Sequence, residues 1–563
     1  MVPSNPVSRR RRELLWFGLF VLWLLAIGLG LRDPWPSDEP RFALVARWMV
    51  EHGQWLFPHR GNELYPDKPP MFMWLQALTY LATGCWRVAF LLPSLVSGLV
   101  TTALVYDLAR RLWNHRIGVY AALLLATTLH FTYQFRNAQI DPVLVGWVTL
   151  ANYGLLRHLL LGPNWRWFWF GCFFAGVGVI TKGVGILALL MLLPYAFARR
   201  RDWRLLAMPV GAWRWAAGVV AFLLPVLAWL LPMLATAYFD GSAEHAKYVR
   251  DILFGQTVQR YTNPDGHIHG PLYFPGVILG DWLPFSLALP WAIPAWWRRI
   301  KRHDARVLLP LAWVLLVVMF FSFSPGKRDV YILPALPMAV LALAPLLPGL
   351  LRKDGPRRAL CLLLLGFGVL LVLAAGMALW RHPAWATNLE ASLDPRIWWL
   401  LGAIGLTALL VVALMRVRRA PLGWLVFAAA TWSLYGLWGY PLMNDARSAR
   451  GVMHAARDAA GPDATLGLVA WKEQNLLMAE GPTVEFGFLR PWPQQFADAV
   501  AWLHADSAHR RLFVQDAAMG DCVLRGRAID LGRANRRDWW LLGADALVPG
   551  CVPTTDAGAT DEE

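Results

Sequence analysis

The chain has 563 residues, of which 57% are hydrophobic and 16% are charged, and its mean hydropathy is +0.41. Soluble globular proteins carry about 25% charged residues, so this composition excludes an ordinary soluble protein and indicates a membrane protein. The net charge of +16 does not indicate nucleic-acid binding, because the basic residues cluster in short segments between apolar runs. Short basic loops of this kind stay on the cytoplasmic side of a membrane.

The first predicted element is the apolar run Leu14–Leu31, which follows the basic stretch Arg9–Arg12. No small-residue cleavage site follows this run, so we expect an uncleaved membrane anchor rather than a signal peptide. The next segment, residues 32–86, is predicted to be the first outer loop. Its apolar stretch Met71–Thr83 is shorter than the ~17 residues that a spanning helix needs, so we expect an interfacial or re-entrant helix on the outer face.

The remaining topology follows from keeping every basic cluster in the cytoplasm. This rule predicts an all-α core of about thirteen membrane-spanning helices, each judged against the ~20 residues that cross a bilayer. The predicted spans are 14–31, 87–109, 117–132, 141–161, 166–181, 183–198, 215–236, 271–296, 307–323, 331–350, 359–380, 397–415 and 421–440. An odd number of spans places the N-terminus in the cytoplasm and the C-terminus outside.

The composition changes after the last span, which predicts two domains, residues 1–440 and residues 441–563. Strand-like pieces at Thr465–Ala470 and Arg511–Gln515 and a helical pattern at Gln494–His504 predict a small α/β domain in the outer compartment. Cys522 and Cys551 both fall in this domain, where an oxidising compartment could pair them; two unpaired buried thiols are the alternative.

Charged clusters remain once the cytoplasmic loops are set aside, and the topology places all of them on the outer face. Ionisable groups at membrane depth are costly, so they indicate function by default. The clusters are Asp38-Glu39-Pro40-Arg41, Tyr65-Pro66-Asp67-Lys68, Asp141-Pro142, Thr181-Lys182-Gly183, Gly326-Lys327-Arg328 with Tyr331, and, in the long loop 237–270, Arg260 and His267-Ile268-His269.

Sugar transfer from a phosphate-linked donor is a reaction that these groups could share. Fixed cations stabilise the charge that develops on the leaving phosphate, which suits Lys68, Arg260, Lys327 and Arg328. A carboxylate, Asp38 or Asp141, accepts the proton of the attacking hydroxyl or orients an acceptor that is already ionised. Tyr331 is a further hydrogen-bond donor to the phosphate. We also assign Arg41 to the phosphate site, and Glu39, Tyr65 and Lys182 to contacts with the substrate.

Each of these residues also has a structural interpretation. Asp38 and Asp141 stand where a helix begins and could simply cap it. Lys68 could be an interfacial lysine whose amine reaches the headgroups. Lys182 lies between two spans and could have no role beyond ending one of them. Asp67, His267 and His269 form a candidate divalent-metal site, because His-x-His occurs in such sites. The alternative is that no metal or other cofactor is bound.

The same residues resemble a known family. The stretch from Asp38-Glu39-Pro40-Arg41-Phe42 through His52-Gly53-Gln54-Trp55 to Tyr65-Pro66-Asp67-Lys68-Pro69-Pro70 is similar to the first outer loop of the aminoarabinose transferases and related bacterial protein-mannosyltransferase-like enzymes. Further similarities follow in order at Asp141-Pro142, Thr181-Lys182-Gly183, Gln259-Arg260-Tyr261, His269, Gly326-Lys327 and Tyr331-Ile332-Leu333.

The resemblance implies a GT-C fold, with outer-face juxtamembrane helices in the first loop and a lipid-phosphate-sugar donor. It implies that Asp38 is the catalytic carboxylate, that Asp141 is a second functional carboxylate, and that Lys68, Arg260 and Tyr331 contact the donor phosphate. One departure bears on the metal. The position before the lysine is often glutamate in the aminoarabinose branch, where it is associated with a divalent cation, whereas Asp67 stands here.

These observations predict an inverting glycosyltransferase of the bacterial inner membrane with a periplasmic active site. The expected donor is a sugar on undecaprenyl phosphate, with 4-amino-4-deoxy-L-arabinose as the leading sugar and lipid A or another envelope glycolipid as the acceptor. The alternatives are a protein O-mannosyltransferase-like enzyme with a protein acceptor and a transporter of lipid-linked sugars. Transporters are often built from repeated halves, and no such repeat is visible in this sequence. Beyond membrane lipids we expect no obligate partner, and we expect a monomer.

Overall fold

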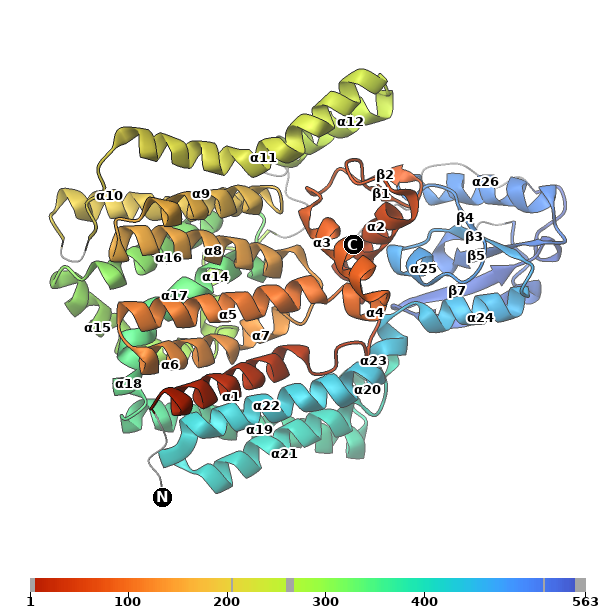
Figure 1. Ribbon diagram of the computed structural model, residues 1–563. Coiled ribbons are helices and arrows are strands. Elements are labelled where there is room, and N and C mark those ends of the chain that lie inside the picture. The colour runs from red at the N-terminus through yellow and green to blue at the C-terminus, as the bar shows by residue number, and fades with distance from the viewer. Residues whose placement is uncertain (1–5, 204–205, 260–267, 520–521, 552–563) are drawn as a thin grey trace.

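The computed structural model describes residues 6–203, 206–259, 268–519 and 522–551. Long helices form a bundle that makes up most of the molecule, and a small sheet with flanking helices adjoins one end of it (Figure 1). The start of α1 (Pro6–Ala26) lies at the opposite end of the bundle, the same end that carries α10 (Leu192–Arg200), α15 (Leu289–Lys301) and α18 (Leu347–Leu350). Basic clusters follow each of these three helices, as the predicted topology requires.

Within the described residues, nine helical stretches are long and apolar enough to cross a bilayer. They are Trp86–Leu112 (α4, Trp86–Ala89, and α5, Leu92–Leu112), Ile140–Leu161 (α8), Gly183–Arg200 (a 3₁₀ helix and α10), Ala212–Asp240 (α11), Ala305–Phe323 (α16), Asp329–Leu350 (including α17, Leu336–Leu343, and α18), Asp354–Arg381 (α19), Ile397–Met415 (α21) and Val417–Arg447 (including α22, Ala420–Leu434, and α23, Tyr440–Arg447). The expectation of a polytopic helical membrane protein is therefore confirmed.

The four other predicted spans are helical, but three are shorter or interrupted and the first lies in a helix that also contains the basic stretch Arg9–Arg12, so the number thirteen stays a prediction. They correspond to α1 (Pro6–Ala26), α6 (His115–Ala126), α9 (Trp165–Val179), and α14 (Tyr273–Gly280) followed by α15. Turns separate α14 from a short 3₁₀ segment and α15 around Pro284. Proline has no backbone N–H to donate, which explains an interruption there.

The first outer loop folds into two helices joined by a short hairpin. The helices are α2 (Asp38–His52) and α3 (Met71–Thr83), and the strands are β1 (His59–Arg60) and β2 (Glu63–Leu64). Gly53 ends α2 with a φ of +68°, a left-handed conformation that suits glycine at a helix C-terminus. The bounds of α3 agree with the apolar stretch predicted to lie at the interface.

The C-terminal part contains a five-stranded mixed sheet with the strand order β4-β3-β5-β7-β6. β3 (Thr465–Val469) pairs in parallel with β4 (Thr483–Glu485) and β5 (Arg510–Gln515), whereas β7 (Arg537–Leu542) is antiparallel to both β5 and β6 (Ile529–Ala534). The helices of this part are α24 (Arg450–Ala460), α25 (Glu473–Met478) and α26 (Trp492–Ala505). The predicted strands and helix are all present.

The sheet and the first outer loop share a hydrophobic core. One buried cluster contains Phe42 of α2 and Phe72 of α3 together with Leu466, Phe513 and Trp539 of the sheet. A second cluster lies between the sheet and α26. Cys522 and Cys551, whose Cα atoms are 5.6 Å apart, form a disulfide. The helical stretch Val417–Arg447 runs past the predicted domain boundary at residue 440, so the division into two domains stays a prediction.

Candidate active site

Asp38 lies in the first turn of α2 and pairs with two arginines. Its Oδ2 lies 3.2 Å from Nη2 of Arg328, and its Oδ1 lies 3.8 Å from Nη1 of Arg41. Asp38 and Glu39 supply the negative charge that a helix N-terminus favours, and Pro40 occupies a first-turn position that needs no N–H donor. The predicted catalytic carboxylate therefore meets the basic loop that precedes Tyr331.

Asp141 lies in the first turn of α8 and has its own cation. Nζ of Lys182 lies 2.7 Å from Oδ1 of Asp141 and donates a hydrogen bond to it. The same ammonium group stands 4.7 Å from the centre of the Tyr331 ring, within the range of a cation–π contact. Three of the predicted clusters thus come together at the ends of their helices.

Arg328 connects these two groups electrostatically. Burial lowers the pKa of its guanidinium, but Asp38, Asp141 and Tyr331 act in the opposite direction, and the net pKa is raised above its ordinary value. Arg328 therefore contacts Asp38 directly and is near enough to Asp141 to interact with it electrostatically. Arg328 is one of the cations that the sequence predicts for the donor phosphate.

Arg41 is held by the sheet-containing part of the chain. Its Nε lies 3.0 Å from Oε1 of Glu473, the first residue of α25, and Nη1 of Arg60 lies 3.5 Å from the same oxygen. The Glu473 side chain is only 5% exposed. Burial lowers the pKa of Arg41, but Glu473, Tyr65 and Asp38 raise it by more. Glu473 is a site residue that sequence analysis missed, because no motif or membrane boundary marks it.

Lys327 takes part in a backbone contact rather than standing free in a loop. The residue is 5% exposed, and its Nζ donates a hydrogen bond of 2.8 Å to the carbonyl of His269. Ile268 and Gly326 form an antiparallel bridge beside this bond. Lys327 therefore fastens the end of the long outer loop, and this bond uses one of its three N–H donors.

The Tyr65–Lys68 segment lies between β2 and α3. Tyr65 is 1% exposed, and burial, followed by the charge of Asp67, raises the pKa of its hydroxyl. This burial favours a structural role for Tyr65, beside Arg41, over the predicted contact between Tyr65 and a substrate. Asp67 and Lys68 are both half-buried.

The candidate metal ligands do not form a site among the residues with described positions. His269 is exposed, and its ring stacks on Tyr273 with centroids 4.3 Å apart. In the described segments, no three or more His, Cys, Asp or Glu side chains lie close enough to hold a metal ion. Arg260 and His267 lie outside these segments, so the predicted roles of Arg260 in phosphate binding and of His267 in metal binding stay predictions.

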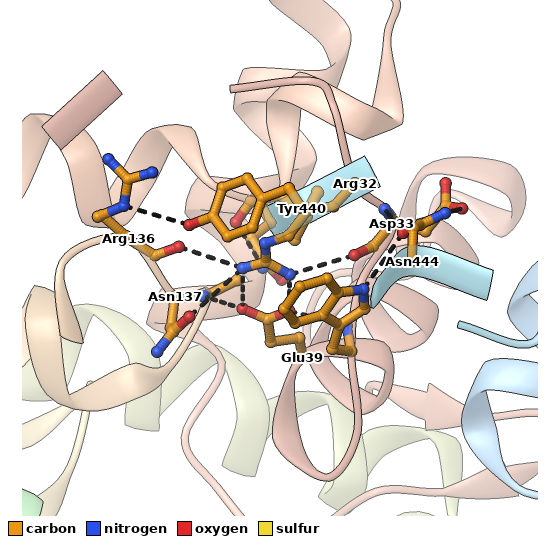
Figure 2. Close-up of polar contacts among 11 residues, drawn as sticks. Arg32, Asp33, Glu39, Arg136, Asn137, Tyr440 and Asn444 are labelled. Atoms are coloured by element: carbon orange, nitrogen blue, oxygen red, sulfur yellow. Dashed lines mark hydrogen bonds and ion pairs between the residues drawn. The ribbon is translucent and has the colours of Figure 1, made fainter. Parts of the chain in front are cut away.

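Glu39 has a buried ion-pair partner, Arg32, which sequence analysis missed. Figure 2 shows Arg32 between the Glu39 carboxylate and the backbone of Arg136. Because this pair occupies Glu39, the structure favours a supporting role over the predicted contact with substrate. Arg32 and Asp33 stand directly after the first apolar run, so their charge at a membrane edge was the signal available in the sequence.

Comparison with known proteins identifies the family. The family model described as dolichyl-phosphate-mannose-protein mannosyltransferase matches residues 67–229. An undecaprenyl phosphate-alpha-4-amino-4-deoxy-L-arabinose arabinosyl transferase from Pseudomonas aeruginosa is 32% identical over 423 residues, which is 67% of this chain and 73% of that protein. A protein of the same name from Pectobacterium carotovorum is 31% identical over 372 residues, or 63% of each chain.

A solved structure gives the fold. ArnT from Cupriavidus metallidurans, crystallised with undecaprenyl phosphate, superposes with a TM-score of 0.73 at 21% identity and covers 95% of this chain and 99% of that one. Its apo form gives a TM-score of 0.71. The fold expectation, a GT-C membrane core with a small C-terminal sheet, is therefore confirmed. Because the identity to the Pseudomonas aeruginosa protein is 32% over two thirds of the chain, the chain belongs to the undecaprenyl phosphate-alpha-4-amino-4-deoxy-L-arabinose arabinosyl transferase family and is a membrane glycosyltransferase.

Proposed function

We propose that this protein transfers 4-amino-4-deoxy-L-arabinose from undecaprenyl phosphate to lipid A. The names of its relatives support the sugar and the lipid carrier. The observation that carries the proposal is the ion pair between Asp38 and Arg328, with Asp141 and Lys182 close by. A site that combines carboxylates with fixed cations suits a reaction in which a phosphate leaves while an acceptor oxygen attacks.

The reaction is a single displacement at the anomeric carbon. The acceptor oxygen forms a bond to this carbon while the bond from the carbon to the phosphate oxygen breaks, and undecaprenyl phosphate leaves with the electron pair. One displacement inverts the configuration of the sugar and needs no covalent enzyme intermediate. Asp38 accepts the acceptor's proton, or orients the acceptor where it is already ionised, with Asp141 as the second carboxylate.

Cations stabilise the phosphate as its charge grows. Arg328 and Arg41 stand beside Asp38, and Lys182 stands beside Asp141. We assign Lys68, Arg260, Lys327 and Tyr331 to the same phosphate group. Arginine suits this task, because its planar guanidinium can donate two parallel hydrogen bonds to phosphate oxygens.

The proposed location is the bacterial inner membrane, with the active site and the sheet on the periplasmic side. The basic clusters near the N-terminal end of the bundle support a cytoplasmic position for that end. The Cys522–Cys551 disulfide supports an oxidising compartment for the sheet. A lipid-linked donor and lipid A would then reach the site from the outer leaflet.

The experiment compares lipid A and total envelope glycolipids by mass spectrometry in cells with and without this protein. Cells that carry Asp38→Asn test the site. Cells that carry Asp354→Asn serve as a control, since Asp354 begins α19 at the other end of the bundle and its side chain is 72% exposed. The proposal expects a lipid A mass increment of one aminoarabinose in the wild-type and control cells alone. A sugar found instead on protein would favour the mannosyltransferase-like alternative.

A further inference from the structure

Arg32 and Glu39 form a buried ion pair at the first turn of α2. The Arg32 side chain has no exposed surface, and that of Glu39 is 6% exposed. Nη2 of Arg32 lies 2.7 Å from Oε1 of Glu39, and Nη1 donates to Oε2, so the pair is bidentate. The rings of Trp35, Phe90 and Tyr440 surround the guanidinium. A charge pair enclosed in this way has a strongly defined geometry, because either partner alone would be a buried unpaired charge.

The carboxylate of Glu39 also binds two backbone N–H groups from different parts of the chain. The amide of Trp35 donates to Oε2 and the amide of Ala138 donates to Oε1, each at 2.8 Å. Trp35 belongs to the first outer loop, three residues before Asp38. Ala138 belongs to the turn that leads into α8, three residues before Asp141.

Arg32 reinforces the same connection from the other side. Its Nη2 donates to the carbonyl of Arg136 at 3.1 Å, and Figure 2 shows the guanidinium placed between the two segments. Arg136 is fixed in turn, since its guanidinium donates to the carbonyls of Leu24 and Ile27 at the end of α1. The turn before α8 is therefore held against α1 and α2 by two buried arginines.

We infer that Arg32 and Glu39 are a positioning pair, which sets the distance and orientation between the carboxylates of Asp38 and Asp141. Glu39 neighbours Asp38 in the first turn of α2, and its carboxylate holds the backbone three residues before Asp141. Neither residue is placed to touch the substrate. The contacts of Arg32 and Glu39 with the backbone of residues 35, 136 and 138 are called the clamp below. The inference rests on the proposed function for the roles of the two aspartates, but the clamp is a property of the fold alone.

The clamp also connects to the part of the chain that carries the sheet. The Asn444 side-chain oxygen in α23 (Tyr440–Arg447) accepts from Trp35 Nε1 at 3.2 Å and from the backbone N–H of Asp33 at 2.8 Å. Asp33 in turn binds Arg450 of α24 at 2.7 Å. Residues 32–39 are thus fixed on both flanks, which leaves the first turn of α2 little freedom to move.

A purely stabilising role predicts a different outcome from a positioning role, and a double variant separates them. Replacement of a buried ion pair by apolar side chains of similar size often preserves stability. Arg32→Met combined with Glu39→Leu removes both charges but leaves the amide of Ala138 without its acceptor. Glu39→Gln and Arg32→Lys are the conservative single variants, which keep the shape or the charge of one partner.

The experiment uses the purified full-length protein in lipid nanodiscs, with the undecaprenyl-phosphate aminosugar donor and lipid A as substrates. The readouts are kcat, the KM for the donor, the thermal midpoint of unfolding and hydrogen exchange of peptides that cover 33–42 and 136–142. Asp304→Asn is the matched control, because Asp304 pairs with Arg299 and Arg306 at the opposite end of the bundle.

We expect the double variant to remain folded while its kcat falls about 100-fold, since a displacement of about 1 Å at a reacting group has an effect of that size. The donor KM should change less than about twofold, since neither residue binds the donor, and hydrogen exchange should rise in 136–142. Arg32→Lys should keep more activity than Glu39→Gln. Asp304→Asn should lower the thermal midpoint while kcat and the exchange of both peptides stay as in the wild type.

A folded double variant with wild-type kcat and unchanged exchange would overturn the inference. If the double variant does not fold, the kcat and the hydrogen exchange of Glu39→Gln test the inference in its place. If the wild-type protein transfers no aminosugar, the proposed function fails, and hydrogen exchange alone judges the clamp. Raised exchange in 136–142 of Glu39→Gln would then support it, and unchanged exchange would refute it.

Discussion

Arg328 Nη2 lies 3.2 Å from Asp38 Oδ2 and joins the loop after α16 to the first turn of α2. The two residues are 290 positions apart in the sequence. The pair leaves the carboxylate accessible, because 17% of the Asp38 side chain and 38% of the Arg328 side chain are exposed. An accessible carboxylate beside a cation suits both proton acceptance and the orientation of an anionic acceptor.

Asp38→Asn should reduce kcat by about 10²- to 10⁴-fold, the range that a positioned acid or base contributes. Its stability should change by no more than about 1 kcal/mol, because partly exposed ion pairs contribute little. The check is the transfer rate of the purified variant, alongside its thermal midpoint. Glu51→Gln is a suitable control, since Glu51 pairs with Arg47 at the far end of the same helix. A rate within threefold of the wild type would remove Asp38 from the catalytic role.

Glu473→Gln should weaken catalysis although the residue belongs to α25, outside the helical bundle. The variant keeps the shape of the side chain but leaves Arg41 and Arg60 without the carboxylate they share. With this partner lost, Arg41 should pair more closely with Asp38, and that pairing would compete with the acceptor. We expect a fall in kcat of about tenfold, equivalent to about 1.4 kcal/mol in the activation free energy.

The rate of Glu473→Gln is best compared with that of Glu473→Asp, which keeps the charge on a shorter side chain. Recovery of activity in Glu473→Asp would show that the charge near Arg41 matters. Equal activity of Glu473→Gln and the wild type would mean that α25 contributes only stability. Circular dichroism of both variants checks that the sheet remains folded.

Sequence patterns were informative wherever local order decides the structure. The helix α3 lies between Pro70 and Gly84, which mark its two ends, so its bounds followed from the sequence. An ionisable group at a membrane boundary costs free energy, so the sequence alone indicates a role for Asp38, Asp141, Lys182 and Arg328. The rule that basic loops remain in the cytoplasm then predicts that these residues lie on the same, outer face of the membrane.

Tertiary packing decided the rest, and no local pattern encodes it. Glu39 and Tyr65 share the motif stretches of the first loop with Asp38, yet both are buried. Glu473 enters the site because the sheet and α2 share a hydrophobic core, which a sequence cannot reveal without a contact map. The charge of Arg32 at a membrane edge marks it in the sequence, but its burial against Glu39 depends on tertiary packing.

Asp33 predicts a pH dependence of stability. Burial alone raises the pKa of its carboxyl, but hydrogen bonds from Arg450, Arg87 and Asn444 stabilise the ionised form and hold the pKa well below its ordinary value. The stability that Asp33 contributes is therefore complete above its ordinary pKa of about 3.9 and is lost as the pH falls toward the lower folded value. The wild-type thermal midpoint should decline below about pH 4 for this reason.

Asp33→Asn should be less stable than the wild type at pH 7 by about 1–3 kcal/mol, the effect of leaving hydrogen-bonded partners without a charged acceptor. The difference in stability should narrow as the pH falls from 5 to 3, because the unfolded wild-type chain then binds a proton at Asp33 while the folded chain does not, which lowers the stability of the wild type. Thermal unfolding of both proteins between pH 5 and pH 3 measures this difference in stability. Asp354→Asn should follow the wild-type curve, since Asp354 is exposed. A constant difference between Asp33→Asn and the wild type would contradict the prediction.

The sidedness of the fold can be measured with single cysteines. Cys85 is exposed, so the background for labelling is Cys85→Ser, which keeps the Cys522–Cys551 disulfide, the buried Cys172 and Cys361, which is half-buried within the apolar helix α19. Leu489→Cys places a thiol on the sheet side, where Leu489 is 69% exposed, and Arg302→Cys places one in the exposed loop between α15 and α16.

A membrane-impermeant maleimide should label Leu489→Cys in cells whose inner membrane is intact, because the proposed topology places the sheet in the periplasm. Arg302→Cys should be labelled only after the inner membrane is permeabilised, since basic loops remain in the cytoplasm. The Cys85→Ser background alone should stay unlabelled. The reverse pattern would place Asp38 and Arg328 in the cytoplasm, and it would be incompatible with a periplasmic reaction at this site, whatever sugar is transferred.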